Sequence, residues 1–227
     1  SGDKGNDQPL TPAPSPQQAK AIALADAIQK ASLAGGDGTE LESITAKAFE
    51  FLGFSVQLIS GSGNPDIVAA ALMGEDTYRV LVETKSRSSG VINQNDVNFN
   101  ALTEHKAKAS ADYVVVFGAD FGGGNLEKWA SEQGIRLLRV EELRQVLLAH
   151  ADAAIPLDQL RELFIGGGST DEGTLSALLA DSESASQLML LCRQVYDAIL
   201  EHQDEEATLS GDALYYVLGG AHSIQAI

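Results

Sequence analysis

The chain has 227 residues, 44% of them hydrophobic and 21% charged, and a single cysteine, Cys192. This composition is typical of one substantial globular domain, and one cysteine excludes an intrachain disulfide and fits a reducing compartment. The sequence contains no apolar run of membrane-spanning length and no signal peptide, so we expect a cytoplasmic protein without a membrane partner. A net charge of −17 argues against tight autonomous binding to nucleic acid, which generally requires a basic surface.

The start of the chain is predicted to hold a polar leader, two helices and a strand. Prolines among polar residues predict disorder, and an alanine-rich segment that ends at two glycines predicts a helix. Thr39 is expected to cap the second helix, with Glu42 at the capping-box position three residues later. The predicted ranges are a leader at 1–15, helices at 16–34 and 39–52, and a strand at 54–60.

A β-hairpin is predicted to follow. Residues 67–73 and 78–82 form two short apolar runs, partly β-branched, as expected of strands. Gly74, Glu75 and Asp76 separate the runs and supply the polar and flexible residues of a turn. The two runs therefore pair most simply as antiparallel neighbours.

This hairpin brings two acids together. If it folds symmetrically about the turn, Asp66 lies opposite Glu83, with Cβ atoms about 4.5–5.5 Å apart. Glu83 and Lys85 are two residues apart and share one face of their strand, whereas Thr84 points to the other. Two carboxylates and a lysine at a strand end predict a catalytic site; the alternative is a salt-bridge cluster of purely structural character.

The chain up to residue 165 continues with alternating strands and helices. Such an order implies parallel pairing, beside the antiparallel hairpin of the first half. We therefore predict an α/β fold with a mixed central sheet flanked by helices on both faces. The predicted strands are 113–117 and 135–140, and the predicted helices are 96–110, 125–133, 141–150 and 156–164.

The last part, residues 166–227, is expected to be an acidic, all-helical appendage. It contains ten acidic residues against one basic residue, Arg193, and begins at a run of three glycines. Apolar residues at helical spacing predict helices at 175–180, 184–202 and 211–218. No element closes this part, so we interpret it as the possible start of a further domain.

A helix with the acid Glu42 is followed by a strand, then by Pro65-Asp66, and then by Glu83-Thr84-Lys85. This order of the predicted elements and motifs resembles that of the PD-(D/E)xK nuclease superfamily. The resemblance covers roughly residues 36–165. We therefore predict an endonuclease domain that spans residues 16–165, including the first predicted helix. The segments around both motif pieces are similar to Mrr-type endonucleases and archaeal Holliday-junction resolvases. The longer layout, including the segment 155–168, is similar to the cleavage domain of FokI-type restriction enzymes, and we prefer this second likeness because it covers more of the chain.

The resemblance and the chemistry of phosphodiester hydrolysis imply the same roles. Asp66, Glu83 and the backbone carbonyl of Thr84 would bind Mg²⁺, with Mn²⁺ as a substitute, because hard cations prefer oxygen ligands. Lys85 would orient the attacking water and neutralise the phosphate. Glu42, or Glu40 as the alternative, would order metal-bound water or bind a second ion.

A locally positive segment between Lys85 and Lys108 adjoins this site and predicts contacts to the DNA backbone. For each residue the alternative is a solvated surface side chain, and Asn95 and Asn98 are equally good as the polar residue near the substrate. The four histidines have no metal-ligand spacing, and Cys192 lies on an apolar helical stretch. The candidate contacts are Ser86, Arg87, Ser88, Ser89, Asn95, Asn98, Lys106 and Lys108.

We interpret the chain as the cleavage domain of a type IIS-like restriction enzyme that acts on DNA. One site of this kind cuts one strand, so cleavage of both strands implies a homodimer, and the acidic surface implies a DNA-recognition domain outside this chain. Two alternatives remain open. One is a structure-specific nuclease of the Mrr or resolvase kind, and the other is a nuclease-fold interaction module that no longer cuts.

Overall fold

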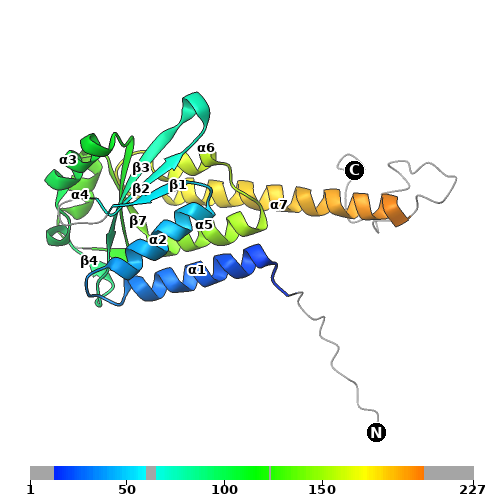
Figure 1. The fold of residues 1–227 in the computed structure, drawn as a ribbon, viewed down its shortest axis with the longest axis horizontal. Helices are drawn as coiled ribbons and strands as arrows, with labels where there is room; N and C mark the ends of the chain where they lie inside the picture. Colours follow the sequence, from blue (N-terminus) through cyan, green and yellow to red (C-terminus); the bar gives the residue numbers. More distant parts are fainter. Residues whose placement is uncertain (1–12, 60–64, 123, 202–227) are drawn as a thin grey trace, which may run out of the picture.

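A computed structural model describes residues 13–59, 65–122 and 124–201, and its centre is a six-stranded mixed sheet (Figure 1). The strand order is β1-β2-β3-β5-β7-β8, with antiparallel pairing from β1 to β3 and parallel pairing from β3 to β8. The strands are β1 (Ser55–Leu58), β2 (Ile67–Ala71), β3 (Tyr78–Lys85), β5 (Tyr113–Gly118), β7 (Ile135–Arg139) and β8 (Gly168–Ser169). The predicted α/β class, with antiparallel and parallel halves, is confirmed.

Helices cover both faces of this sheet, because its central strands are apolar on both sides. Val80 and Val82 of β3 belong to the hydrophobic core on the first face of the sheet, and Leu81 between them belongs to the core on the second face. The first face is covered by α1 (Pro16–Ser32), α2 (Thr39–Phe51), α5 (Val140–Asp152) and α6 (Leu157–Leu160). The second face is covered by α3 (Phe99–Ala109) and α4 (Leu126–Glu132).

The predicted hairpin is formed in the predicted register. Ile67 pairs with Val82 and Ala71 with Tyr78, around the 3₁₀ turn η1 (Gly74–Asp76). β3 is three residues longer than predicted, because its other edge pairs in parallel with β5 as far as Lys85 and Gly118. Residues 83–85 therefore extend β3 past the last pair of the hairpin and are paired with β5.

Two helix starts differ from the prediction. The N-cap of α2 is Gly38, whose φ of 83° suits glycine, and no side chain caps the helix, so the predicted capping role of Thr39 is wrong. The predicted helix 96–110 is divided into a 3₁₀ turn, η2 (Gln94–Asp96), and α3. Asn98 caps α3 through its side-chain oxygen, which accepts a hydrogen bond from Ala101 N at 3.2 Å.

The region after residue 165 differs most. Gly168–Ser169 was expected to lie at a domain boundary and instead forms the edge strand β8, so the central sheet extends past the predicted end of the nuclease domain. The two helices predicted at 175–180 and 184–202 are one helix, α7 (Glu172–Glu201). Ser182, which lies between the two predicted helices, is buried against α5 and donates its hydroxyl to Ala149 O at 3.2 Å.

The remaining elements are short. A second sheet of two parallel strands, β4 (Val91–Ile92) and β6 (Asp120–Phe121), was not predicted, and the 3₁₀ turn η3 (Arg161–Leu163) follows α6. Residues 1–12 of the predicted leader, the loop 60–64 and the predicted helix 211–218 lie outside the described residues. None of the helices within 13–201 is long and apolar enough to span a membrane.

Candidate active site

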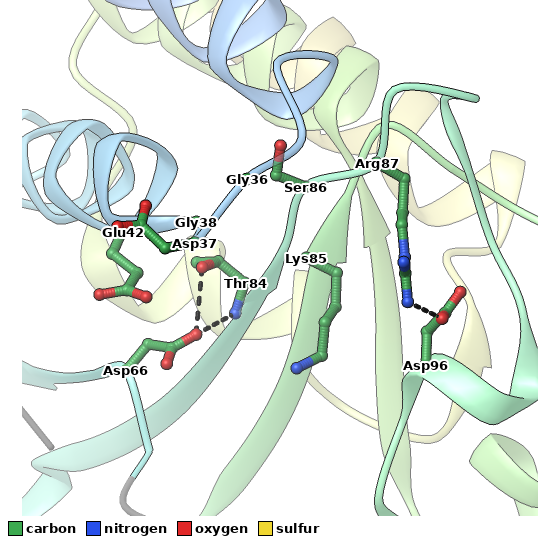
Figure 2. A pocket seen from close by; sticks show the side chains of 10 residues that line it. All are labelled: Gly36, Asp37, Gly38, Glu42, Asp66, Thr84, Lys85, Ser86, Arg87 and Asp96. Atoms are coloured by element: carbon green, nitrogen blue, oxygen red, sulfur yellow. Dashed lines mark hydrogen bonds and ion pairs between the residues drawn. The ribbon is translucent and has the colours of Figure 1, made fainter. Parts of the chain in front are cut away.

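A pocket of about 310 Å³ lies where the carboxyl end of β3 meets the start of α2 (Figure 2). Six predicted site residues line it, contributed by α2, the hairpin and the segment after β3. The complete lining is Gly36, Asp37, Gly38, Glu42, Asp66, Thr84, Lys85, Ser86, Arg87 and Asp96. Segments that are far apart in the sequence are therefore brought together by the pairing of β2 with β3 and by the packing of α2 on that hairpin.

Asp66 is fixed against β3 by two hydrogen bonds. Its Oδ2 accepts from the backbone N of Thr84 at 2.7 Å and from Thr84 Oγ1 at 3.0 Å, so both dashed lines in Figure 2 end on one oxygen. Asp66 directly precedes Ile67, the first residue of β2, which is fully buried. The strand pairing thus sets the position of Asp66, and Thr84 sets the orientation of its carboxylate.

Glu83 and Lys85 form an ion pair on one face of β3, as their spacing predicts. Lys85 Nζ lies 2.7 Å from Glu83 Oε1, and the two side chains are 27% and 17% exposed. The other carboxylate oxygen of Glu83, Oε2, is buried and has no hydrogen-bond partner in the described part of the chain. Burial, followed by repulsion from Asp66, raises the pKa of Glu83, although Lys85 opposes the shift.

Glu42 lines the pocket together with Asp66, whereas Glu83 is not among the residues that line it. It belongs to the first turn of α2 and is half-buried, whereas Glu40 is exposed and does not line the pocket. Burial raises the pKa of Glu42, and repulsion from Asp66, Asp37 and Glu83 raises it further. The site therefore concentrates negative charge, which Lys85 opposes at both Glu42 and Glu83 and His105 opposes at Glu83.

These residues fit a divalent cation. Within 13–59, 65–122 and 124–201, no three His, Cys, Asp or Glu side chains are close enough together to hold a metal by themselves. Mg²⁺ does not require three, because it is commonly held by one or two carboxylates and keeps several waters. The partnerless buried oxygen of Glu83 and the raised pKa values of Glu83 and Glu42 are both features that a bound cation would relieve.

The predicted DNA contacts divide into two groups. Ser86 and Arg87 line the pocket: Arg87 forms an ion pair with Asp96, and Ser86 Oγ accepts from Gly35 N at 2.9 Å and donates to Ala31 O at 2.8 Å. The hydroxyl of Ser86 is therefore engaged with the backbone after α1. The other residues lie away from this pocket: Lys106 and Lys108 in the last turn of α3, Ser88 and Ser89 in the loop before β4, and Asn95 and Asn98 at a second pocket.

Two pocket residues were not singled out from the sequence. Asp37 lies between Gly36 and Gly38, which both have a φ of 83°, and an acid between two glycines before a helix is a signal that could have identified it. Asp96 is drawn to the pocket by its ion pair with Arg87, nine residues away. No local sequence pattern indicates that pairing.

Residues 33–147, just over half of the chain, match a family model described as a restriction endonuclease, the Mrr catalytic domain. No curated protein matches the sequence. The matched range includes every residue that lines the candidate pocket.

Among solved structures, the chain is similar to the restriction endonuclease FokI, with a TM-score of 0.53, and to FokI bound to DNA, with a TM-score of 0.50. Both share 18% identity over 70% of this chain, and they cover 35% and 34% of the FokI chain, so this chain spans about a third of that length. Both expected resemblances are thus found, to FokI in the fold and to Mrr in the sequence. The chain belongs to the Mrr-type restriction endonuclease family.

Proposed function

We propose that this chain is a metal-dependent endonuclease that hydrolyses phosphodiester bonds of DNA, with Mg²⁺ as the natural ion and Mn²⁺ as a substitute. The observation that carries the proposal is the convergence of Asp66, Glu83 and Lys85 where β3 ends, beside a pocket open to solvent. Family membership supports nuclease chemistry, and the likeness to a FokI structure that contains DNA supports DNA as the substrate.

The side chains have distinct roles in this proposal. Asp66, Glu83 and the Thr84 carbonyl hold the ion, which when bound activates water and polarises the phosphate. Lys85 donates hydrogen bonds to the attacked phosphate and offsets its charge in the transition state. Glu42 accepts hydrogen bonds from water and so orients the nucleophile.

Arg87 is the cation best placed to contact the DNA backbone, because it lines the pocket and its side chain is half exposed. Its partner Asp96 holds the guanidinium at the pocket before DNA arrives, and a phosphate can replace that carboxylate as the acceptor. Lys106 and Lys108 extend the positive surface along α3. Ser86 acts as a positioning residue, since its hydroxyl is bound to the backbone near α1.

One catalytic pocket cuts one strand, so we propose that two copies of the chain assemble on DNA for double-strand cleavage. The net charge of −17 disfavours independent DNA binding, which supports sequence recognition by a domain outside this chain, as in a type IIS-like enzyme. A second candidate is a structure-specific endonuclease, which the Mrr-type family match favours. Either enzyme would act in the cytoplasm.

The test is cleavage of supercoiled plasmid at low salt and high protein concentration, with Mg²⁺ or with a chelator. The wild type should nick or linearise the plasmid only with the metal, and Asp66→Ala and Lys85→Ala should abolish cleavage. Lys47→Ala, at an exposed position of α2, is the matched control and should cut normally. A second-order dependence of linearisation on protein concentration would support the dimer.

Branched DNA separates the two candidates, because a structure-specific enzyme should cut a junction or flap faster than a linear duplex of the same sequence. Wild-type protein that is folded but leaves every substrate intact in Mg²⁺ and Mn²⁺ would contradict the enzymatic proposal. That result would favour an interaction module with a nuclease fold.

A further inference from the structure

A second pocket adjoins the catalytic one and has different chemistry. Its volume is about 770 Å³, more than twice that of the catalytic pocket, and it lies between residues 94–100 and the second half of α4. Asp96 lines both pockets, so they are neighbours that share one wall. A polymer that passes the catalytic pocket could therefore place a neighbouring group in the second one.

An aromatic side chain is held at this second pocket. Trp129 is 37% exposed and packs edge to face on Phe99, with ring centroids 6.0 Å apart and planes at 87°. Phe99 itself is buried, as is Val97 beside it. The indole is thus fixed by a buried apolar base and remains accessible from solvent, which suits stacking of a planar ligand.

The polar groups around Trp129 are mostly side-chain amides. Gln94 Oε1 accepts from Asn125 N at 3.0 Å, and Asn98 Oδ1 accepts from Ala101 N at 3.2 Å. These bonds orient both amides and leave each amide nitrogen as a donor. Asn95 and Gln133 are further lining amides and are exposed to solvent.

The charge of this pocket excludes a phosphate as its main ligand. No lysine or arginine is among its lining residues, and the two charged groups that line it, Asp96 and Glu132, are acids. Arg87 lies on the catalytic side of Asp96. Backbone phosphates are therefore favoured on one side of Asp96, and a neutral group rich in donors and acceptors on the other.

We propose that this second pocket binds an unpaired nucleobase of the DNA whose backbone enters the catalytic pocket. The inference rests on the proposed nuclease function and narrows its substrate to DNA with an unpaired nucleotide next to the cut. Every base can stack on an aromatic ring, and amides of Asn and Gln match the hydrogen-bonding edges of bases. In a duplex both the stacking face and the pairing edge are occupied, so the base must be unpaired or extruded.

Trp129 provides the test, because it is the only tryptophan of the chain and its fluorescence reports on this pocket alone. Lys85→Ala protein with Mg²⁺ would be titrated with a short single-stranded oligonucleotide, its duplex, and the same strand with abasic sites. The single strand should quench the fluorescence saturably, and the abasic strand and the duplex should bind with at least about fivefold lower affinity or cause no quenching.

A pair of variants tests the amides. Gln133→Ala should weaken the quenching titration by about fivefold, the loss expected for one hydrogen bond. Gln159→Ala, an exposed glutamine of α6 on the opposite face of the sheet, should leave the titration unchanged. Equal quenching by the abasic and the intact strands, or equal affinities of Lys85→Ala protein with and without the added Gln133→Ala substitution, would overturn the inference.

Two parallel measurements separate this inference from the proposed function. Anisotropy of a labelled strand reports binding anywhere on the protein, and wild-type plasmid cleavage reports the catalytic site. Binding and cleavage without a change in Trp129 fluorescence would overturn the base pocket and leave the nuclease intact. Base-dependent quenching without any cleavage would support the pocket and contradict the nuclease, and absence of binding would overturn the pocket whatever the cleavage result.

Discussion

Lys85 Nζ lies 2.7 Å from Glu83 Oε1, and the two side chains project from alternate positions on one face of β3. This ion pair leaves the second oxygen of Glu83 buried without a partner in the described chain. Glu83 thus has one oxygen bound by a neighbouring cation and one buried oxygen whose capacity to accept a hydrogen bond is not used. Such a pair holds Lys85 and Glu83 in place before substrate arrives.

Replacing Lys85 by methionine should slow cleavage strongly while the protein stays folded. Methionine keeps much of the side-chain volume and removes the charge that would stabilise the phosphate, so the rate should fall by roughly 10²–10³. Initial rates of plasmid nicking measure the effect, and Lys47→Met on the exposed side of α2 provides the control. A Lys85→Met rate within a few-fold of the wild type would exclude a direct role for Lys85.

The acid cluster should make folding less favourable as the pH rises. Glu83 and Glu42 have raised pKa values in the folded protein, so between the ordinary glutamate value and these raised values the folded state binds more protons than the unfolded state. The contribution of these two groups to the free energy of unfolding should therefore be fully present below the ordinary value and decrease as pH rises through the raised values. Urea unfolding at a series of pH values measures this slope.

Glu83→Gln should flatten that slope, and Glu50→Gln, at an exposed position of α2, should not. Mg²⁺ should raise the midpoint of thermal unfolding near neutral pH, because it binds the ionised carboxylates of the folded state. The rise should disappear in Glu83→Gln. Identical pH slopes in wild type and Glu83→Gln would show that this carboxyl group does not set the dependence.

Ser86→Ala should destabilise the fold and slow cleavage together. The hydroxyl accepts from Gly35 N and donates to Ala31 O. Its loss removes the acceptor for Gly35 N, whereas Ala31 O still accepts from Ala34 N at 3.2 Å, so the expected cost is that of one unpaired donor, about 1–3 kcal/mol. Ser184→Ala, whose hydroxyl bonds only to Ala180 O within α7, is the control for urea unfolding and for cleavage rate. Unchanged stability in Ser86→Ala would mean that water replaces the hydroxyl at no cost.

Gly118→Ala should distort the strand next to Lys85. A Cβ at position 118 would lie 1.9 Å from Ile92 Cδ1 and 3.0 Å from Lys85 O, which requires movement of β4 or β3. Overpacking of this kind costs about 1–3 kcal/mol. Because Ile92→Val removes Cδ1, the double variant should regain stability relative to Gly118→Ala. A double-mutant cycle by urea unfolding measures this coupling, and strict additivity would contradict the contact.

The sequence was sufficient to predict the hairpin, its register and the convergence of Asp66 with Glu83. Two apolar runs on either side of a short turn allow one symmetric pairing, and a shift by one residue would exchange the buried and half-buried faces of β2. The fold class followed for a similar reason, since alternating strands and helices have few ways to pack. Local patterns therefore determined the centre of the sheet.

The features that were missed depend on tertiary contacts. Gly168–Ser169 pairs with β7 although its sequence has no strand character. Asp96 lines the candidate active-site pocket, where it forms an ion pair with Arg87. The second pocket arises from the packing of α4 beside η2 and α3, which no periodicity encodes. Thr39 has the features of an N-cap residue, but the N-cap of α2 is Gly38, which has a positive φ.

Hydrogen bonds between the end of α1 and the residues that follow β3 limit how far the chain can be truncated from its N-terminal side. The family match starts at residue 33, yet Ser86 Oγ bonds to Ala31 O, and Arg87 N donates to Ser32 O at 3.0 Å. A fragment trimmed to residue 33 would lose those bonds and uncover the apolar side of α5 on which α1 lies. The smallest fragment that keeps these contacts therefore begins at α1, about one helix ahead of the family boundary.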